Sequence, residues 1–563
     1  MMLRSTLFQS SKNIWSMENS GRFIMLRYAQ TLLFLIFEKF RLINMRKTLW
    51  LFAGLLVACN SSQKTVKTEE VSKEPANPTI YAETITEPEL KEHLFTYASD
   101  EFEGRETGQP GQKKAIAYIR SEYEKLGIPA AKANGDYFQK VPIEISKIPI
   151  GKLSVNNTDF LLGEHVLTFS EAQSKNNEVV YAGFGIEDEN YSDYQGLEVS
   201  GKLVLIKSGE PVDKDGSYVI SGSSEKSIWS NMSESLGKRI QLAQEKGASG
   251  ILYYDAENYP RFKSRFDYMK NSSSGRMSLK DVASENFSSI FIDNILAETI
   301  MPDIETNDSP KNLEAQLTLS FESSNLMVDS ENVVAFIKGT EKPDEFLIIS
   351  SHLDHIGITE NGEINNGADD DGSGTVAMLE IAEAFQKAKE EGNGPRRSIV
   401  FLHVTGEEKG LLGSEYYTDV DPIFPLDRTV ADLNIDMVGR IDPKREGDKN
   451  YIYLIGSDKL STELHELSEE INSKYTSLEL DYTYNDENDP NRFYYRSDHY
   501  NFAKNNIPII FYFNGTHDDY HRPSDTPDKI NYDLLENRTK LIFYTAWELA
   551  NRQNPVIVDK AAD

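Results

Sequence analysis

The strongest constraint on the fold is an alternation of short apolar runs and longer amphipathic segments in the C-terminal half of the chain. Helical spacing of apolar residues predicts helices over 375–389, 459–474 and 532–553. The apolar runs, each expected to form a strand, lie at 333–337, 346–349, 399–404, 430–435 and 507–513. Strands that alternate with helices form largely parallel sheets covered on both faces. The sequence therefore predicts an α/β fold with a mostly parallel mixed sheet sandwiched between helices.

Polar residues suited to catalysis or metal binding follow directly after three of the predicted strands. They are His352 and Asp354, then Glu407 and Glu408, and then Asp436. The carboxyl ends of parallel strands meet at one edge of a sheet, where open α/β folds place their ligands. An isolated Glu-Glu pair is usually a solvated face, but a buried strand has no reason to present adjacent acids to its core. We therefore expect these side chains to share one site.

A glycine-flanked turn, GADDDGSG, adds three adjacent acids at residues 369–371. Neighbouring carboxylates repel one another unless water or a cation screens them, and a divalent metal does so most effectively. A solvated acidic turn is the alternative. Two imidazoles and three carboxylates make a mixed donor set suited to zinc, and with one bridging carboxylate they can hold two ions about 3.5–4 Å apart. The candidates for this set are His352, Asp354, Asp370, Glu407, Glu408, Asp436 and His521.

Five ordered motifs carry a resemblance to a known family. They are HLD, GADDDGSG, GEEKGLLGS, NIDMVGR and YHRPSDT, beginning at residues 352, 367, 406, 434 and 520. The sequence resembles the bacterial leucyl-aminopeptidase family of two-zinc exopeptidases, which includes glutamate carboxypeptidase and the transferrin-receptor ectodomain. This resemblance implies a zinc exopeptidase fold with two zinc ions per chain.

The resemblance also assigns roles to the ligands. His352 and Asp436 would bind one zinc, Glu408 and His521 would bind the other, and Asp370, the second acid of its turn, would bridge them. The family's frequent cis peptide after the bridging residue would fall between positions 370 and 371.

Further roles follow from chemistry and from the same resemblance. Asp354 is expected to accept the second N–H of His352 and fix its tautomer. Glu407 would be the general base that takes a proton from the attacking water and passes it to the leaving amine. Tyr520 matches a position that hydrogen-bonds the developing oxyanion, with a packed core tyrosine as the alternative.

Other polar residues have weaker assignments. The segment YYRSDHYNF resembles a substrate-side segment of the family. Its candidate substrate-binding residues are Arg496, Asp498 and His499, and a structural role is the alternative for them. The sequence favours ordinary hydrogen-bonded side chains, not ligands, at His355, His403 and His517.

An inserted domain is expected within the peptidase-like layout. We divide the ordered chain into a first peptidase part at 81–169, an insert at 170–305 and a catalytic part at 306–555. The insert resembles a β-rich protease-associated (PA) domain, which would shape substrate access without carrying chemistry. Its stretch NYPRFKSRFDY, residues 258–268, is locally basic, and we expect it to be a surface excursion, with selection of an acidic substrate as the alternative.

The N-terminal region predicts export. Met45-Arg46-Lys47 precedes an apolar stretch at 49–58 that ends in Leu-Val-Ala before Cys59, the single cysteine of the chain. This pattern is typical of a secretory signal and resembles a bacterial lipobox. We expect an N-terminal extension and lipoprotein signal peptide at 1–58, with Met45 as the start, and a flexible tether at 59–80. The expected location is the periplasmic side of a bacterial membrane or the cell surface, with the membrane reached only through lipid on Cys59.

Charge and the complete donor set narrow the function. The 90 acidic residues exceed the 59 basic ones, giving a formal net charge of −31, which opposes binding to nucleic-acid phosphate. We expect a zinc-dependent aminopeptidase that hydrolyses the N-terminal bond of peptides. The alternatives are a carboxypeptidase, which needs basic residues for a substrate carboxylate; a glutaminyl cyclase, which uses one zinc; and a non-catalytic receptor-like module, in which metal positions degenerate.

Overall fold

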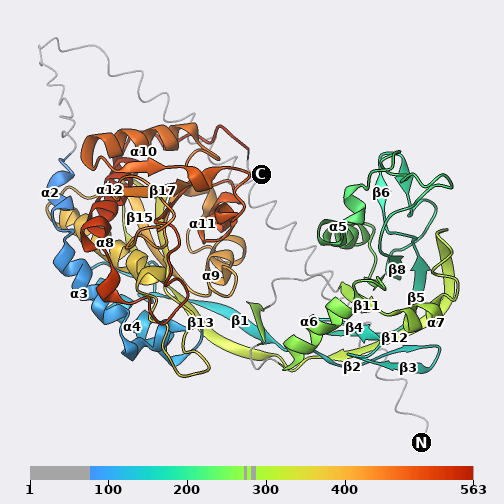
Figure 1. Ribbon diagram of the computed structural model, residues 1–563. Helices are drawn as coiled ribbons and strands as arrows, with labels where there is room; N and C mark the ends of the chain where they lie inside the picture. Colours follow the sequence, from blue (N-terminus) through green and yellow to red (C-terminus); the bar gives the residue numbers. More distant parts are fainter. Residues whose placement is uncertain (1–75, 272–274, 281–286, 562–563) are drawn as a thin grey trace, which may run out of the picture. The chain divides into compact units, whose positions relative to one another are not determined.

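The computed structural model describes residues 76–271, 275–280 and 287–561 (Figure 1). Within these ranges the strands form a nine-stranded sheet, an eight-stranded sheet and a two-stranded ribbon. No helix in these ranges is long and apolar enough to cross a membrane. The predicted signal peptide, Cys59 and most of the predicted tether lie outside the described residues.

The nine-stranded sheet has a parallel centre. Its strand order is β10-β1-β13-β15-β14-β16-β19-β17-β18, with parallel pairing from β15 through β14 and β16 to β19, and between β17 and β18. The remaining neighbours pair antiparallel. The strands are β1 (Phe138–Ser146), β10 (Arg276–Leu279), β13 (Leu326–Ile337), β14 (Lys342–His352), β15 (Arg397–Val404), β16 (Thr429–Ile435), β17 (Tyr451–Ile455), β18 (Glu479–Asp481) and β19 (Ile509–Phe513).

Helices cover this sheet on both faces, because successive side chains of a strand point to opposite faces. In β14, Leu347 and Ile349 enter one apolar cluster, whereas Phe346 and Ile348 enter another. The first cluster includes residues of α8 (Gly374–Glu390) and α12 (Tyr532–Asn551), and the second includes residues of α11 (His499–Ala503). The remaining helices around the sheet are α2 (Thr79–Ala82), α3 (Glu87–Tyr97), α4 (Pro110–Lys125), α9 (Leu412–Glu415) and α10 (Thr462–Tyr475). The predicted α/β fold with a mixed, helix-covered sheet is confirmed, with parallel pairing concentrated at its centre.

The eight-stranded sheet is drawn from residues 150–322, a range wider at both ends than the predicted insert. Its strand order is β3-β2-β12-β5-β8-β9-β11-β4. The strands are β2 (Ile150–Val155), β3 (Thr158–Leu161), β4 (Val166–Leu167), β5 (Ala172–Tyr181), β8 (Leu203–Lys207), β9 (Gly250–Tyr254), β11 (Ser288–Ile292) and β12 (Lys311–Glu322). The helices in this range are α5 (Met232–Glu245), α6 (Tyr259–Asn271) and α7 (Asn294–Ile300), and the ribbon pairs β6 (Glu187–Asp188) with β7 (Tyr191–Ser192). Strand β10 lies inside this range of sequence but joins the nine-stranded sheet.

Candidate metal centre

The register of the central strands places three segments side by side at the carboxyl edge of the sheet. His352 at the end of β14 pairs with Val404 at the end of β15, and Ser350 pairs with Asn434 of β16. The residues that immediately follow β15 and β16 therefore emerge next to His352. This register explains why Glu407 and Asp436, which lie 55 and 84 residues after His352 in sequence, reach the same site.

The three neighbouring carboxylates of the acidic turn after Gly367 have different hydrogen-bond and ion-pair partners. Asp369 accepts the main-chain N–H of Gly439 at 2.7 Å. Asp371 accepts the main-chain N–H groups of Gly374, Met437 and His352 at 2.9, 3.1 and 3.2 Å. These two acids therefore stabilise the loop and its neighbours. Asp370, which is joined to Asp371 by the expected cis peptide bond, is the acid that faces the other candidate ligands.

Gly367 is required for this turn. Its φ of 54° lies in the left-handed region, which favours glycine. A Cβ at this position would lie 2.2 Å from the main-chain oxygen of Asp370 and 2.5 Å from the ring of His355. The missing side chain thus lets the acidic turn approach the histidine closely.

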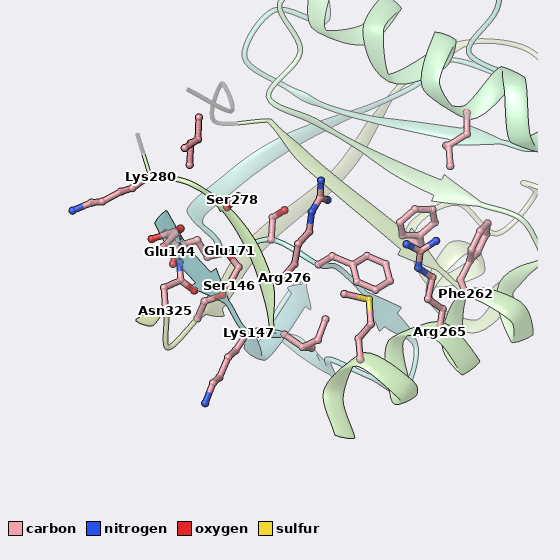
Figure 2. A pocket seen from close by; sticks show the side chains of 18 of the residues that line it. Glu144, Ser146, Lys147, Glu171, Phe262, Arg265, Arg276, Ser278, Lys280 and Asn325 are labelled. Carbon is pink, nitrogen blue, oxygen red and sulfur yellow. Dashed lines mark hydrogen bonds between the residues drawn. The ribbon is translucent and has the colours of Figure 1, made fainter. Parts of the chain in front are cut away.

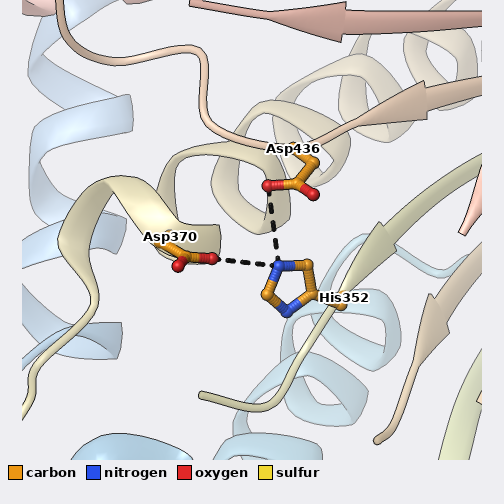
Figure 3. Close-up of side chains that lie close together, drawn as sticks. All are labelled: His352, Asp370 and Asp436. Carbon is orange, nitrogen blue, oxygen red and sulfur yellow. Dashed lines mark ion pairs between the residues drawn. The ribbon is translucent and has the colours of Figure 1, made fainter. Parts of the chain in front are cut away.

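One group of donors surrounds the Nε2 atom of His352 (Figure 3). Oδ1 of Asp370 lies 3.2 Å from this nitrogen, and Oδ1 of Asp436 lies 3.6 Å from it. The Nδ1 atom of His352 lies 3.0 Å from the main-chain oxygen of Asp354. A carbonyl oxygen can only accept, so Nδ1 carries a proton and Nε2 is the ring nitrogen that faces the two carboxylates.

A second group of donors lies on the other side of Asp370. Its Oδ2 atom is 3.1 Å from Nε2 of His521, which is also 3.1 Å from Oε2 of Glu408. His355 belongs to the same group, with Nδ1 2.8 Å from Oε1 of Glu408 and 3.7 Å from Oδ2 of Asp370. The two oxygens of Asp370 therefore serve different groups, as a bridging ligand would require.

The chemistry of these atoms fits cations. Nε2 of His352, Oδ2 of Asp370 and Oε1 of Glu408 are buried without a hydrogen-bond partner. Buried polar atoms ordinarily have a hydrogen-bond partner. Histidine nitrogens and carboxylate oxygens that converge without such partners are the usual ligand atoms of a zinc site. The five ligands that the sequence predicted thus converge in two groups that share Asp370.

The electrostatics of the cluster also favour a positive charge beside the carboxylates. Burial lowers the pKa of His521, but hydrogen bonds to Asp370 and Glu408 outweigh burial and raise that pKa to about 10. Burial likewise opposes protonation of His352, yet the nearby charges of Glu407 and Asp436 raise its pKa well above the ordinary value. The carboxylates therefore stabilise cationic neighbours, and a divalent ion would supply the charge that protons otherwise bring.

His355 is a part of the site that the sequence did not assign. It was expected to be an ordinary hydrogen-bonded histidine, but neither of its buried ring nitrogens has a hydrogen-bond partner, and Nδ1 faces Glu408. Its spacing of three residues after His352 is the signal in the sequence that could have indicated this role. His403 does follow the expectation, since its ring contacts the hydroxyl of Tyr123 at 2.8 Å.

Asp354 acts differently from the expectation. Its main-chain oxygen, not its carboxylate, is the partner of the His352 imidazole. The carboxylate instead accepts the hydroxyl of Thr107 at 2.7 Å and the main-chain N–H of Glu407 at 3.2 Å. The side chain therefore positions the segment that carries Glu407, and the backbone alone fixes the imidazole tautomer.

A small cavity of about 30 Å³ adjoins the donor groups. Glu407, Asp436 and Tyr520 line it together with Asp370, and the Tyr520 ring stacks on His521 with centroids 3.9 Å apart. Burial raises the pKa of Glu407 well above its ordinary value, and the nearby charges of Glu408 and Asp436 add to that effect. The predicted base and the predicted oxyanion donor thus face one space.

The substrate-side candidates divide into two kinds. Arg496 lines the small cavity, with its guanidinium 4.9 Å from the ring centroid of Phe493. Asp498 is buried and accepts the hydroxyl of Ser414. His499 is buried with Nε2 2.8 Å from the main-chain oxygen of Tyr494, and burial lowers its pKa to about 3. Asp498 and His499 therefore support the wall that carries Arg496.

Comparison with known proteins gives the family. Residues 332–546 match the family described as Peptidase family M28. This part of the chain belongs to peptidase family M28. The resemblance inferred from the five motifs is thereby confirmed, and the M28 domain contains every candidate ligand.

Curated relatives match only a short stretch. The probable glutamate carboxypeptidase LAMP1 of Arabidopsis thaliana is 34% identical over 120 residues, which is 21% of this chain and 16% of that protein. The aminopeptidase NAALADL1 of Mus musculus is 36% identical over 109 residues, 19% of this chain and 14% of that protein. The chain therefore spans less than a fifth of the length of these relatives.

Two of the solved structures to which the chain is similar are named aminopeptidases. The aminopeptidase from Aneurinibacillus sp. strain AM-1 covers 86% of this chain and 98% of its own, with 19% identity and a TM-score of 0.44. The zinc aminopeptidase BSAP from Bacillus subtilis covers 83% of this chain and 96% of its own, with 19% identity and a TM-score of 0.42.

Proposed function

We propose that the chain is a two-zinc metallo-exopeptidase that removes the N-terminal residue of peptides. The observation that carries this proposal is the position of Asp370, whose two carboxylate oxygens face different imidazoles, with Oδ1 3.2 Å from Nε2 of His352 and Oδ2 3.1 Å from Nε2 of His521. One ion would be held by His352, Asp370 and Asp436. The other would be held by Asp370, Glu408 and His521, with His355 beside it. When bound, the zinc ions would act as Lewis acids that polarise the scissile carbonyl and lower the pKa of the attacking water.

Residues around the small cavity would carry out the proton transfers of the reaction. Glu407 faces the cavity and would take one proton from the water as its oxygen attacks the peptide carbonyl carbon. The same carboxyl would then give that proton to the departing amine as the carbon–nitrogen bond breaks. The Tyr520 hydroxyl would donate a hydrogen bond to the oxygen on which negative charge develops.

The walls of the small cavity favour an apolar first residue. Phe493, Phe511, Phe513 and Met437 line it, and these side chains offer no partner for a charged substrate group. The eight-stranded part of the chain, which the sequence likens to a protease-associated domain, would govern access to this space. Peptides with an apolar N-terminal side chain are therefore the proposed substrates.

A carboxypeptidase on the same fold is the second candidate, and Arg496 favours it. Its guanidinium lines the small cavity and could pair with a substrate carboxylate. One curated relative is also named a probable glutamate carboxypeptidase. The rest of the lining holds three carboxylates and several aromatic side chains but no second cation, so we place the aminopeptidase first.

A peptide panel with metal analysis separates these functions. Purified protein would be offered matched peptides with a free or an acetylated N-terminus, and zinc would be measured on the same sample. Two zinc ions per chain and release of the first residue only from free peptides are expected. Cleavage of acetylated peptides from their carboxyl end would replace the aminopeptidase assignment, whereas cyclisation of N-terminal glutamine would indicate a glutaminyl cyclase. A metal-loaded protein with no activity on any peptide would favour a binding module.

We also propose that the mature protein is a lipoprotein anchored through Cys59. The signal-like sequence before this single cysteine supports the assignment. The protein expressed with its own N-terminus in a bacterial host should enter the membrane fraction and incorporate labelled palmitate. A Cys59→Ala variant should lose the label. Equal labelling of both proteins would refute the anchor.

A further inference from the structure

A second and much larger cavity lies outside the metal centre. It has a volume of about 1510 Å³ and shares no lining residue with the small cavity (Figure 2). Residues of α6, of β1 and of β10 contribute to its walls. The proposed peptidase chemistry uses none of these residues.

One face of α6 forms part of the wall. Arg261, Phe262, Arg265 and Met269 line the cavity, and their spacing of three and four residues places them on one side of the helix. Lys263 does not line the cavity and instead pairs with Asp267 of the same helix. The helix therefore directs both of its arginines into the cavity, whereas Lys263 pairs with an acid of the same helix. Of the two predictions for this basic stretch, the arrangement favours a binding role.

The opposite wall includes an edge strand. β10 is the first strand in the order of the nine-stranded sheet and pairs only with β1, so its other edge has no strand partner among the described residues. Arg276, Ser278 and Leu279 line the cavity, and Met277 packs against an apolar cluster that also contains Leu279. An unpaired strand edge of this kind can hydrogen-bond the main chain of an extended peptide.

The charge of the cavity is opposite to that of the chain. The basic side chains that line the cavity are exposed and take part in no ion pair among the described residues, although the whole chain carries a formal charge of −31. Figure 2 labels Arg265 and Arg276 among the side chains that line the cavity. The lining has five cations, Lys147, Arg261, Arg265, Arg276 and Lys280, against two acids, Glu144 and Glu171.

We propose that this basic cavity binds an extended, acidic segment of a peptide. The unpaired arginines would pair with its carboxylates, and Phe262 and Met269 would contact the aliphatic parts of its side chains. The free edge of β10 and the apolar groups favour a peptide over a nucleic acid or polyphosphate, which carries no backbone amide for a strand edge.

The position of β10 links the cavity to the catalytic loop. Leu279 of β10 is paired with Ile143 of β1, and both pack in one cluster with Leu412. Ile143 would also lie 3.6 Å from a Cβ at Gly406, the residue before Glu407. Strand β1 packs on this loop, and β10 is its neighbour in the sheet. A peptide bound along the free edge of β10 would therefore be separated from β1 by β10 alone. The binding itself does not depend on the proposed peptidase activity.

Binding can be measured without catalysis. The probe is a fluorescent peptide of alternating glutamate and alanine, acetylated and amidated at its ends, and its neutral counterpart has glutamine for glutamate. Fluorescence anisotropy of the full chain should show at least about tenfold tighter binding of the acidic peptide, weakening as salt is added. Equal binding of the two peptides would overturn the proposal. Tighter binding of a single-stranded oligonucleotide or polyphosphate of equal charge would overturn the peptide as occupant.

Matched variants assign the binding to this cavity. Arg261→Glu combined with Arg265→Glu should weaken acidic-peptide binding at least about tenfold. Lys214→Glu combined with Lys270→Glu makes the same change of net charge at exposed positions outside the cavity and should bind like the wild type. Both double variants should match the wild type in thermal unfolding midpoint. Equal loss of binding in the two variants, or no loss in the first, would refute the assignment.

Discussion

The main-chain N–H of Glu407 donates to the Asp354 carboxylate across 3.2 Å. This contact ties the segment after β15 to the segment after β14, and so sets where the Glu407 side chain begins. The same Asp354 residue contributes its main-chain oxygen to the His352 imidazole. A single residue therefore positions both a proposed ligand and the proposed base, through different atoms.

Replacing the Asp354 carboxylate should impair catalysis more than metal binding. In Asp354→Asn the main-chain oxygen that holds His352 is unchanged, but the charged acceptor for the Glu407 N–H is lost. We expect a fall in kcat of about 10–100-fold with zinc content close to that of the wild type. Kinetics and metal analysis on the same sample would test this. A variant that loses one zinc ion would show that the side chain instead supports the ligands.

Glu407→Gln tests the assignment of the general base. Glutamine keeps the shape of the side chain but cannot accept a proton, so kcat should fall about 100- to 10,000-fold while both zinc ions stay bound. Full activity in a metal-loaded Glu407→Gln protein would remove this residue from the mechanism. Glu360→Gln, at an exposed loop position, is the matched control and should have wild-type kinetics.

His355 is the residue whose role is least expected from the sequence, and its substitution should affect one ion. Nδ1 of His355 lies 2.8 Å from Oε1 of Glu408 and 3.7 Å from Oδ2 of Asp370. We expect His355→Ala to weaken binding of one of two zinc ions about 10–100-fold, the size of a lost supporting contact. Zinc titration with a competing chelator would measure this. Unchanged affinity at both sites would leave His355 with a packing role.

The sequence predicted the strands and the convergence of five ligands because both depend on local patterns. Apolar runs of the right length indicate buried parallel strands, and such strands necessarily bring their carboxyl ends together. His352, Glu408 and Asp436 each follow such a run, so their proximity required no knowledge of side-chain packing. The motifs then located Asp370 and His521 in the turns around them.

The remaining features depend on contacts between distant segments. Asp369 and Asp371 look equivalent to Asp370 in sequence, and only the N–H groups of residues 437 and 439 that they accept distinguish them. His355 faces Glu408 across 53 positions of the chain. The strand β10 leaves the insert to join the other sheet, a choice of pairing that the residues 276–279 do not encode by themselves. Tertiary context decides such details.

The buried carboxyl of Glu380, near the middle of α8, gives a prediction about stability. Glu380 is 1% exposed, and its Oε1 lies 3.6 Å from Nε2 of His93 on α3. Burial raises the pKa of Glu380 to about 9, and the nearby charges of Glu89 and Glu383 add to the rise. In the unfolded chain an ordinary glutamate has a pKa of about 4.3. The folded protein therefore binds more protons than the unfolded chain between about pH 4 and pH 9.

This difference fixes the sign of the pH dependence. The group's contribution to stability is fully present below about pH 4 and is lost as pH rises toward 9, because folding then requires a proton from increasingly basic solution. Glu380→Gln has a similar shape and cannot ionise, so it escapes this loss. We expect it to exceed the wild type in free energy of unfolding by on the order of 1–3 kcal/mol at pH 8 and by much less at pH 5. Urea unfolding at both pH values would measure the gap, and a gap of the same size at pH 5 and pH 8 would contradict titration of Glu380 as its source.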